Sequence, residues 1–94
     1  MTVTVNGKDY IPKKLTRYHI REIYKKGVDI FDISKEGFDE NEFLRKSVDV
    51  ILDVCYPEDA EVFDKAEIKE VILLTKSIIN ETFEDKAGDE EKNL

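Results

Sequence analysis

The Asn6-Gly7 pair near the start of the chain constrains the fold more than any other feature. Before it, Val3 and Val5 alternate with threonines, and after it the apolar pattern resumes at Tyr10. A type I′ turn needs positive φ at both central residues, which Asn-Gly tolerates well. Residues 1–12 are therefore predicted to form a β-hairpin that ends before Pro12, since proline cannot donate to a strand ladder.

Residues 16–85 are predicted to be helical. The first helix is predicted over residues 17–26, with Thr16 as its N-cap and Gly27 as its stop signal. Its predicted apolar face consists of Ile20, Ile23 and Tyr24. Residues 28–38 are predicted to form a loop or a short helical turn. In that segment the side chains expected to pack on the core are Ile30, Phe31 and Ile33.

A second helix is predicted to begin after Asp39, an N-cap with Glu42 in the capping-box position, and to end at Tyr56. A short helix is predicted over residues 57–63, with proline at its first position. The last helix is predicted over residues 66–83, because apolar side chains recur there at i, i+3, i+4 and i+7. The members of this stripe are Ile68, Val71, Ile72, Thr75, Ile78, Ile79, Thr82 and Phe83.

These elements predict a mainly helical α+β fold: an N-terminal β-hairpin followed by a small bundle of three main helices plus one or two short helices. The 94 residues have room for one core. We therefore expect residues 1–85 to form a single globular domain and residues 86–94 a flexible acidic tail. No apolar run approaches the ~20 residues of a membrane span. The lone cysteine and the lack of a secretory signal pattern favour a reducing cytoplasm.

The net charge of −7 is distributed unevenly. Residues 1–28 hold seven Lys or Arg against two acidic residues, whereas residues 29–94 hold eight against twenty. Such polarity is compatible with a charged partner or with self-association, and equally with a solvated surface that faces no partner.

No residue pattern indicates a catalytic, metal or cofactor site. Zinc sites usually need three or four Cys or His ligands, and the chain has one of each, His19 and Cys55. Both are expected to be structural, because Cys55 lies on an apolar stripe and His19 has no oriented partner. A calcium loop starting at Asp32 would place Phe43 where the bidentate glutamate is required. We therefore expect a protein that is not an enzyme and needs no cofactor.

The candidate protein-contact surface combines aromatic and basic side chains: Tyr24, Phe31, Phe38, Arg17 and Arg21. Apolar surface ringed by charge is typical of protein-binding sites. Other apolar residues are expected to belong either to a contact surface or to the core. These are Phe43, Val50, Val54 and Leu74. The basic side chains could also contact nucleic acid, although the acidic remainder of the chain would repel it.

The order of parts resembles that of the tail assembly chaperones of long-tailed bacteriophages and prophages. The resemblance begins in the strand-turn-strand of residues 3–10 and the Lys13-Lys14-Leu15-Thr16 segment that leads into the first helix. It continues in a helix that ends at Cys55-Tyr56-Pro57 and in a long final amphipathic helix. It extends over residues 2–84.

The resemblance implies a non-enzymatic protein that acts in the bacterial host cytoplasm and is absent from the mature virion. Such chaperones coat the tape measure protein and help to recruit tail tube subunits. A programmed ribosomal frameshift often adds a C-terminal extension that contacts the tube protein. Here Glu91-Lys92-Asn93 can be encoded as GAA AAA AAC, which contains the slippery heptamer A AAA AAC.

Two other classes of function remain open from the sequence. One is a small acidic regulatory or inhibitor protein that binds a folded protein partner. The other is a nucleic-acid-binding protein that uses the basic N-terminal segment, for which steep salt dependence of binding would be diagnostic.

Overall fold

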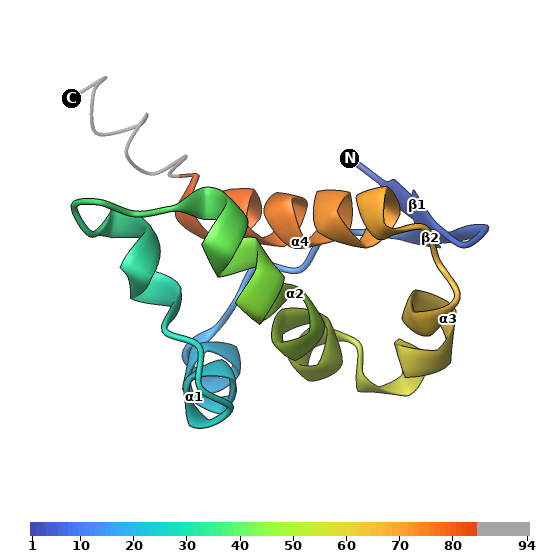
Figure 1. Cartoon of the computed structure of the whole chain (residues 1–94). Coiled ribbons are helices and arrows are strands. Elements are labelled where there is room, and N and C mark those ends of the chain that lie inside the picture. The colour runs from blue at the N-terminus through green and yellow to red at the C-terminus, as the bar shows by residue number, and fades with distance from the viewer. Residues whose placement is uncertain (85–94) are drawn as a thin grey trace, which may run out of the picture.

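The computed structural model describes residues 1–84 and shows a hairpin followed by a mainly helical compact globule (Figure 1). This confirms the predicted fold class. The elements in chain order are β1 (Val3–Val5), β2 (Lys8–Tyr10), α1 (Arg17–Lys25), the 3-10 helix η1 (Ile30–Ser34), α2 (Glu40–Cys55), the 3-10 helix η2 (Pro57–Asp59), α3 (Ala60–Asp64) and α4 (Ile68–Phe83). The predicted tail, residues 86–94, lies outside the described residues.

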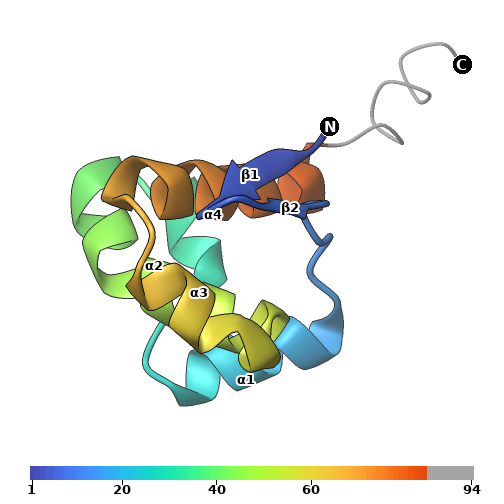
Figure 2. The same cartoon turned by 90° about the vertical axis from the view of Figure 1, so that its right-hand side faces the viewer.

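The hairpin forms as predicted. Its antiparallel register pairs Val3 with Tyr10 and Val5 with Lys8. Asn6 and Gly7 have φ values of 49° and 80°, the positive angles that a type I′ turn requires. Val3, Val5 and Tyr10 are buried, and β1 lies along α4 (Figure 2). The Asn6 amide donates to the Glu70 carboxylate at 3.0 Å, so the turn itself is tied to α4.

Thr16 caps the start of α1, as the sequence predicts, through a capping box that uses an unexpected residue. The Thr16 hydroxyl accepts from the His19 amide, and the Thr16 amide donates to His19 Nδ1 at 3.0 Å. His19 thus takes the place that glutamate or glutamine usually occupies. Burial, with a smaller effect of Lys13, lowers the pKa of His19, which keeps Nδ1 available as an acceptor.

The boundaries of α2 agree with the prediction, whereas the single short helix predicted over residues 57–63 is divided into η2 and α3, which ends at Asp64. The Asp39 carboxylate accepts from the Glu42 amide at 3.2 Å, and α2 ends at Cys55, just before Tyr56-Pro57. Pro57 opens η2, which leads directly into α3. Proline suits this first position because its missing N–H would have no partner inside the helix.

Helix α4 departs from the prediction in its start and in its buried face. It begins at Ile68, two residues later than predicted, with Glu67 as N-cap. Ile68 is 69% exposed, although it was expected on the core stripe, while Leu74 is fully buried, although it was expected off the stripe. The reason is that β1 and α2 both pack on α4, so the buried arc is wider than one stripe and is centred on Leu74 and Ile78.

The adjacent residues Leu73 and Leu74 test this geometry. We expect Leu74→Ala to lower the free energy of unfolding by about 2–5 kcal/mol, because it opens a cavity between the hairpin and α2. Leu73 is 49% exposed, so Leu73→Ala should change the free energy of unfolding by no more than about 0.5–1 kcal/mol. Urea unfolding followed by circular dichroism measures both. Equal losses for the two variants would contradict the described orientation of α4.

Candidate protein-interaction surface

Four of the five predicted contact residues line one shallow groove between α1 and η1. Its lining residues are Arg17, Ile20, Arg21, Tyr24, Asp29 and Phe31. The fifth predicted residue, Phe38, lines a different pocket. The structure therefore brings together the basic and aromatic residues of α1 and η1 and separates Phe38 from them.

The α1 side of the groove follows from helical spacing. Arg17, Arg21 and Tyr24 lie at i, i+4 and i+7, so they occupy one face of the helix. Tyr24 was also predicted to face the core, and this is wrong, because the residue is 65% exposed. Its neighbour Ile23 is fully buried, and a rotation of about 100° per residue turns Tyr24 away from the core.

Phe31 on η1 forms the opposite wall of the groove. It was predicted to pack on the core together with Ile30 and Ile33, yet it is 52% exposed. A 3-10 helix has three residues per turn, so Ile30 and Ile33 share the inward side and Phe31 points away from it. The ring of Phe31 lies edge-on to that of Phe83, with centroids 6.1 Å apart. Its amide is held by Asp29, whose carboxylate accepts at 2.9 Å.

The groove lies in the part of the chain where positive charge is least neutralised. Within residues 1–84, six Lys or Arg side chains take part in no ion pair, and five of them fall between residues 13 and 26. These five are Lys13, Lys14, Arg17, Arg21 and Lys26, and the sixth is Arg45 on α2. The segment that contains α1 is therefore positive in a chain that is negative overall.

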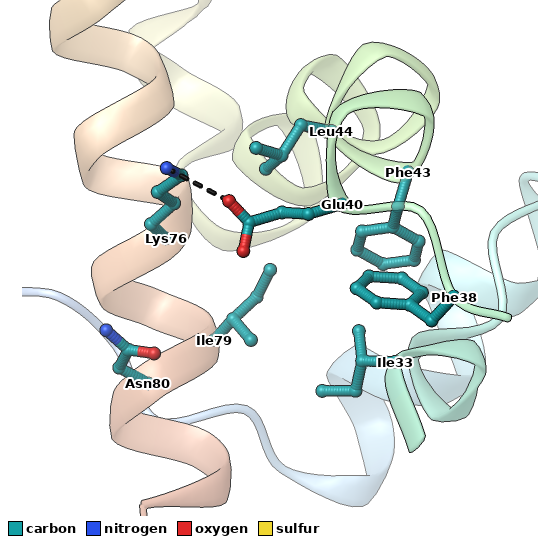
Figure 3. A pocket seen from close by; sticks show the side chains of 8 residues that line it. All are labelled: Ile33, Phe38, Glu40, Phe43, Leu44, Lys76, Ile79 and Asn80. Atoms are coloured by element: carbon teal, nitrogen blue, oxygen red, sulfur yellow. Dashed lines mark ion pairs between the residues drawn. The ribbon is translucent and has the colours of Figure 1, made fainter. Parts of the chain in front are cut away.

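Phe38 belongs to a small pocket between η1, α2 and α4, about 230 Å³ in volume (Figure 3). Its ring lies 5.4 Å from that of the buried Phe43. Beside the apolar side chains, Lys76 of α4 pairs with Glu40 of α2 at 3.1 Å. Phe38 is half-buried, so its ring joins the edge of the core as well as lining this pocket.

A third concave surface, beside α3, has the opposite charge. It is lined by Asp49, Asp53 and Asp64 around apolar residues that include Phe63 and Ile68. In Figure 1 the α3 end of the molecule lies opposite the end that carries η1. This acidic groove is not evident from the sequence, because its carboxylates come from two helices, α2 and α3, that meet only in the fold.

The other apolar positions left open all pack in or against the core. Phe43 and Leu74 are buried, while Val50 and Val54 are half-buried against the core. Sequence reasoning did not single out Phe83 as a contact residue. It is the last residue of α4 and is 37% exposed.

The single cysteine and the buried tyrosine are held in their neutral forms. Cys55 is 1% exposed, and burial raises its pKa to about 11, so little thiolate exists at neutral pH. Burial and the nearby Asp59 carboxylate raise the pKa of Tyr10 to about 12. Asp59 itself pairs with Lys8 at 3.0 Å.

In residues 1–84, no three His, Cys, Asp or Glu side chains are grouped to hold a metal ion. None of the helices described here is both long and apolar enough to cross a membrane.

Comparison with protein-family models, curated proteins and solved structures finds no match for the chain. The resemblance to tail assembly chaperones therefore stays a prediction. What the fold adds is a defined surface: a groove that combines exposed aromatic rings with two arginines.

Proposed function

We propose that this protein is a non-enzymatic chaperone for the assembly of a long-tailed phage tail. In this proposal it binds the tape measure protein and helps to recruit tail tube subunits in the bacterial cytoplasm. The order of sequence features supports the assignment. The observation that carries it is the exposed aromatic groove between α1 and η1.

The groove has the composition that a chaperone surface needs. The two aromatic residues that line it, Tyr24 and Phe31, are each more than half exposed. Exposed aromatic rings bind apolar side chains of a client, and surrounding charges keep the free protein in solution. Because the patch is small, it supports the transient contacts that a chaperone must release once assembly is complete.

Co-expression with the tape measure protein tests the proposal. We expect that protein to be insoluble alone and soluble when this chaperone is present. The double variant Tyr24→Ser/Phe31→Ser should abolish the rescue, since it removes both aromatic walls of the groove. The readout is the soluble fraction of the tape measure protein.

Ile11→Ser is the matched control, because Ile11 is 76% exposed and lies outside the groove. It should leave the rescue intact. Urea unfolding should show that the double variant still folds cooperatively, because both substituted side chains are more than half exposed. Full rescue by a folded double variant would contradict the assignment of the groove. A tape measure protein that stays insoluble with the wild-type chaperone would contradict the function.

Self-association is part of the same proposal. The unpaired cations of residues 13–26 and the acidic groove beside α3 have opposite charges and belong to different segments of the chain. A contact between two such unlike surfaces is heterologous, and it generates rings or helical arrays. Either form suits an elongated client.

Light scattering at low and high salt tests this association. We expect a mass above that of the monomer at high protein concentration and low salt, and a decrease towards the monomer as salt screens the charges. Asp53→Lys/Asp64→Lys should weaken the association, whereas Glu36→Lys, in the loop before α2, should not. A strict monomer at low salt would rule out this part of the proposal.

The gene itself tests the recruitment of tube subunits. We expect A AAA AAC at the codons for Lys92-Asn93, an overlapping −1 reading frame, and then a very long open frame that encodes a helical protein. Nucleotide sequencing of the region checks all three. A neighbourhood without any tail genes would favour the regulatory-protein alternative instead.

A further inference from the structure

We propose that the groove between α1 and η1 recognises an amphipathic helix that carries acidic residues beside its apolar stripe. This inference rests on the proposed function, since it names the chemistry of the client segment at the same surface. It follows from the shape of the groove, from the exposed rings on its walls and from the charge around it.

The shape fits a helix. Arg17, Ile20, Arg21 and Tyr24 form a ridge along α1 at i, i+3, i+4 and i+7. Such a ridge packs into the groove between side-chain rows of a second helix, whose own rows have the same spacing. Phe31 stands on the far side, so a helix laid along α1 would contact aromatic rings on two sides.

The positive charge of the two arginines favours acidic residues beside the apolar stripe of the bound helix. Arg17 and Arg21 are one turn apart, and neither takes part in an ion pair within the described chain. Carboxylates spaced one turn apart on a client helix can meet both guanidinium groups, and arginine can bind a carboxylate through two parallel hydrogen bonds. Lys14 precedes α1 and Lys26 follows it, and these two unpaired lysines add positive charge at the ends of the helix, which favours an acidic partner over a basic one.

The negative groups near the site do not cancel this preference. Asp29 is the one acidic side chain that lines the groove, and it stands against two arginines, so the lining keeps a net positive charge. Glu22, on α1, pairs with Lys25 of the same helix at 3.1 Å. The two arginines are therefore the charged groups available to a client helix.

Two synthetic helical peptides measure the preference directly. Both carry leucine at i, i+3, i+4 and i+7, and the flanking positions hold glutamate in one peptide and lysine in its twin. Fluorescence anisotropy with the full chain gives each dissociation constant at low and at moderate salt. We expect the glutamate peptide to bind about tenfold more tightly at low salt, with a smaller ratio as salt rises.

Charge reversal in the protein links the preference to the groove. Arg17→Glu/Arg21→Glu should invert the ratio between the two peptides. Arg45→Glu is the matched control, because Arg45 is also unpaired but lies on α2 outside the groove, and it should preserve the ratio. Equal binding of the two peptides to the wild type, or the same effect of both variants, would overturn the inference.

Two rival occupants are distinguishable in the same assay. A single-stranded DNA oligonucleotide that binds more tightly than the glutamate peptide and displaces it would overturn the inference in favour of nucleic acid. Loss of self-association in Arg17→Glu/Arg21→Glu, without peptide binding to the wild type, would assign the groove to a second copy. Rescue of the tape measure protein by this variant would overturn the inference while leaving the proposed function standing.

Discussion

The burial of α4 from two sides is the constraint on which the rest of the fold depends. β1 covers one side of this helix and α2 another, and Val5, Ile51 and Leu74 belong to one buried cluster. A hairpin with three-residue strands is marginal alone, so its stability comes from packing on α4. Two hydrogen bonds close this arrangement: the Leu15 amide donates to the Thr82 hydroxyl at 2.9 Å, and the Tyr56 hydroxyl donates to the Ile11 carbonyl at 2.8 Å.

This arrangement also determines which apolar residues remain for binding. One face of α1 packs on α2 and η1, and Ile23 on that face is fully buried. The main contacts of α1 are therefore with α2 and η1 and not with α4. Its outer face therefore keeps Tyr24 and the two arginines in contact with solvent. The last residue of α4, Phe83, lies against Phe31. The interaction surface is thus assembled from segments that the core leaves uncovered.

Ion pairs between residues close in sequence contribute to the uneven distribution of charge along the chain. Several lysines outside α1 pair with an acid three or four residues away, as in Lys35–Asp32 and Lys65–Glu61. Such pairs contribute little to stability, but they neutralise the cations of the acidic part. Residues 13–26 contain too few acids for the same neutralisation, so their positive charge faces solvent. Binding that uses this charge is sensitive to salt, because screening is strong beyond about 10 Å at 0.1 M ionic strength.

The sequence by itself determined the features that depend on neighbouring residues. The Asn6-Gly7 turn, the caps at Thr16 and Asp39, and the stop before Pro57 are local, and all were predictable. Only the tertiary structure decided that Leu74 is buried and Ile68 exposed, and that Tyr24 and Phe31 face a groove. Periodicity shows that a helix has an apolar side, but the width and direction of its buried arc depend on which elements pack against it. The candidate site therefore combines residues that the sequence identified with a geometry that it could not supply, because the groove joins two elements whose relative placement is set by the shared core.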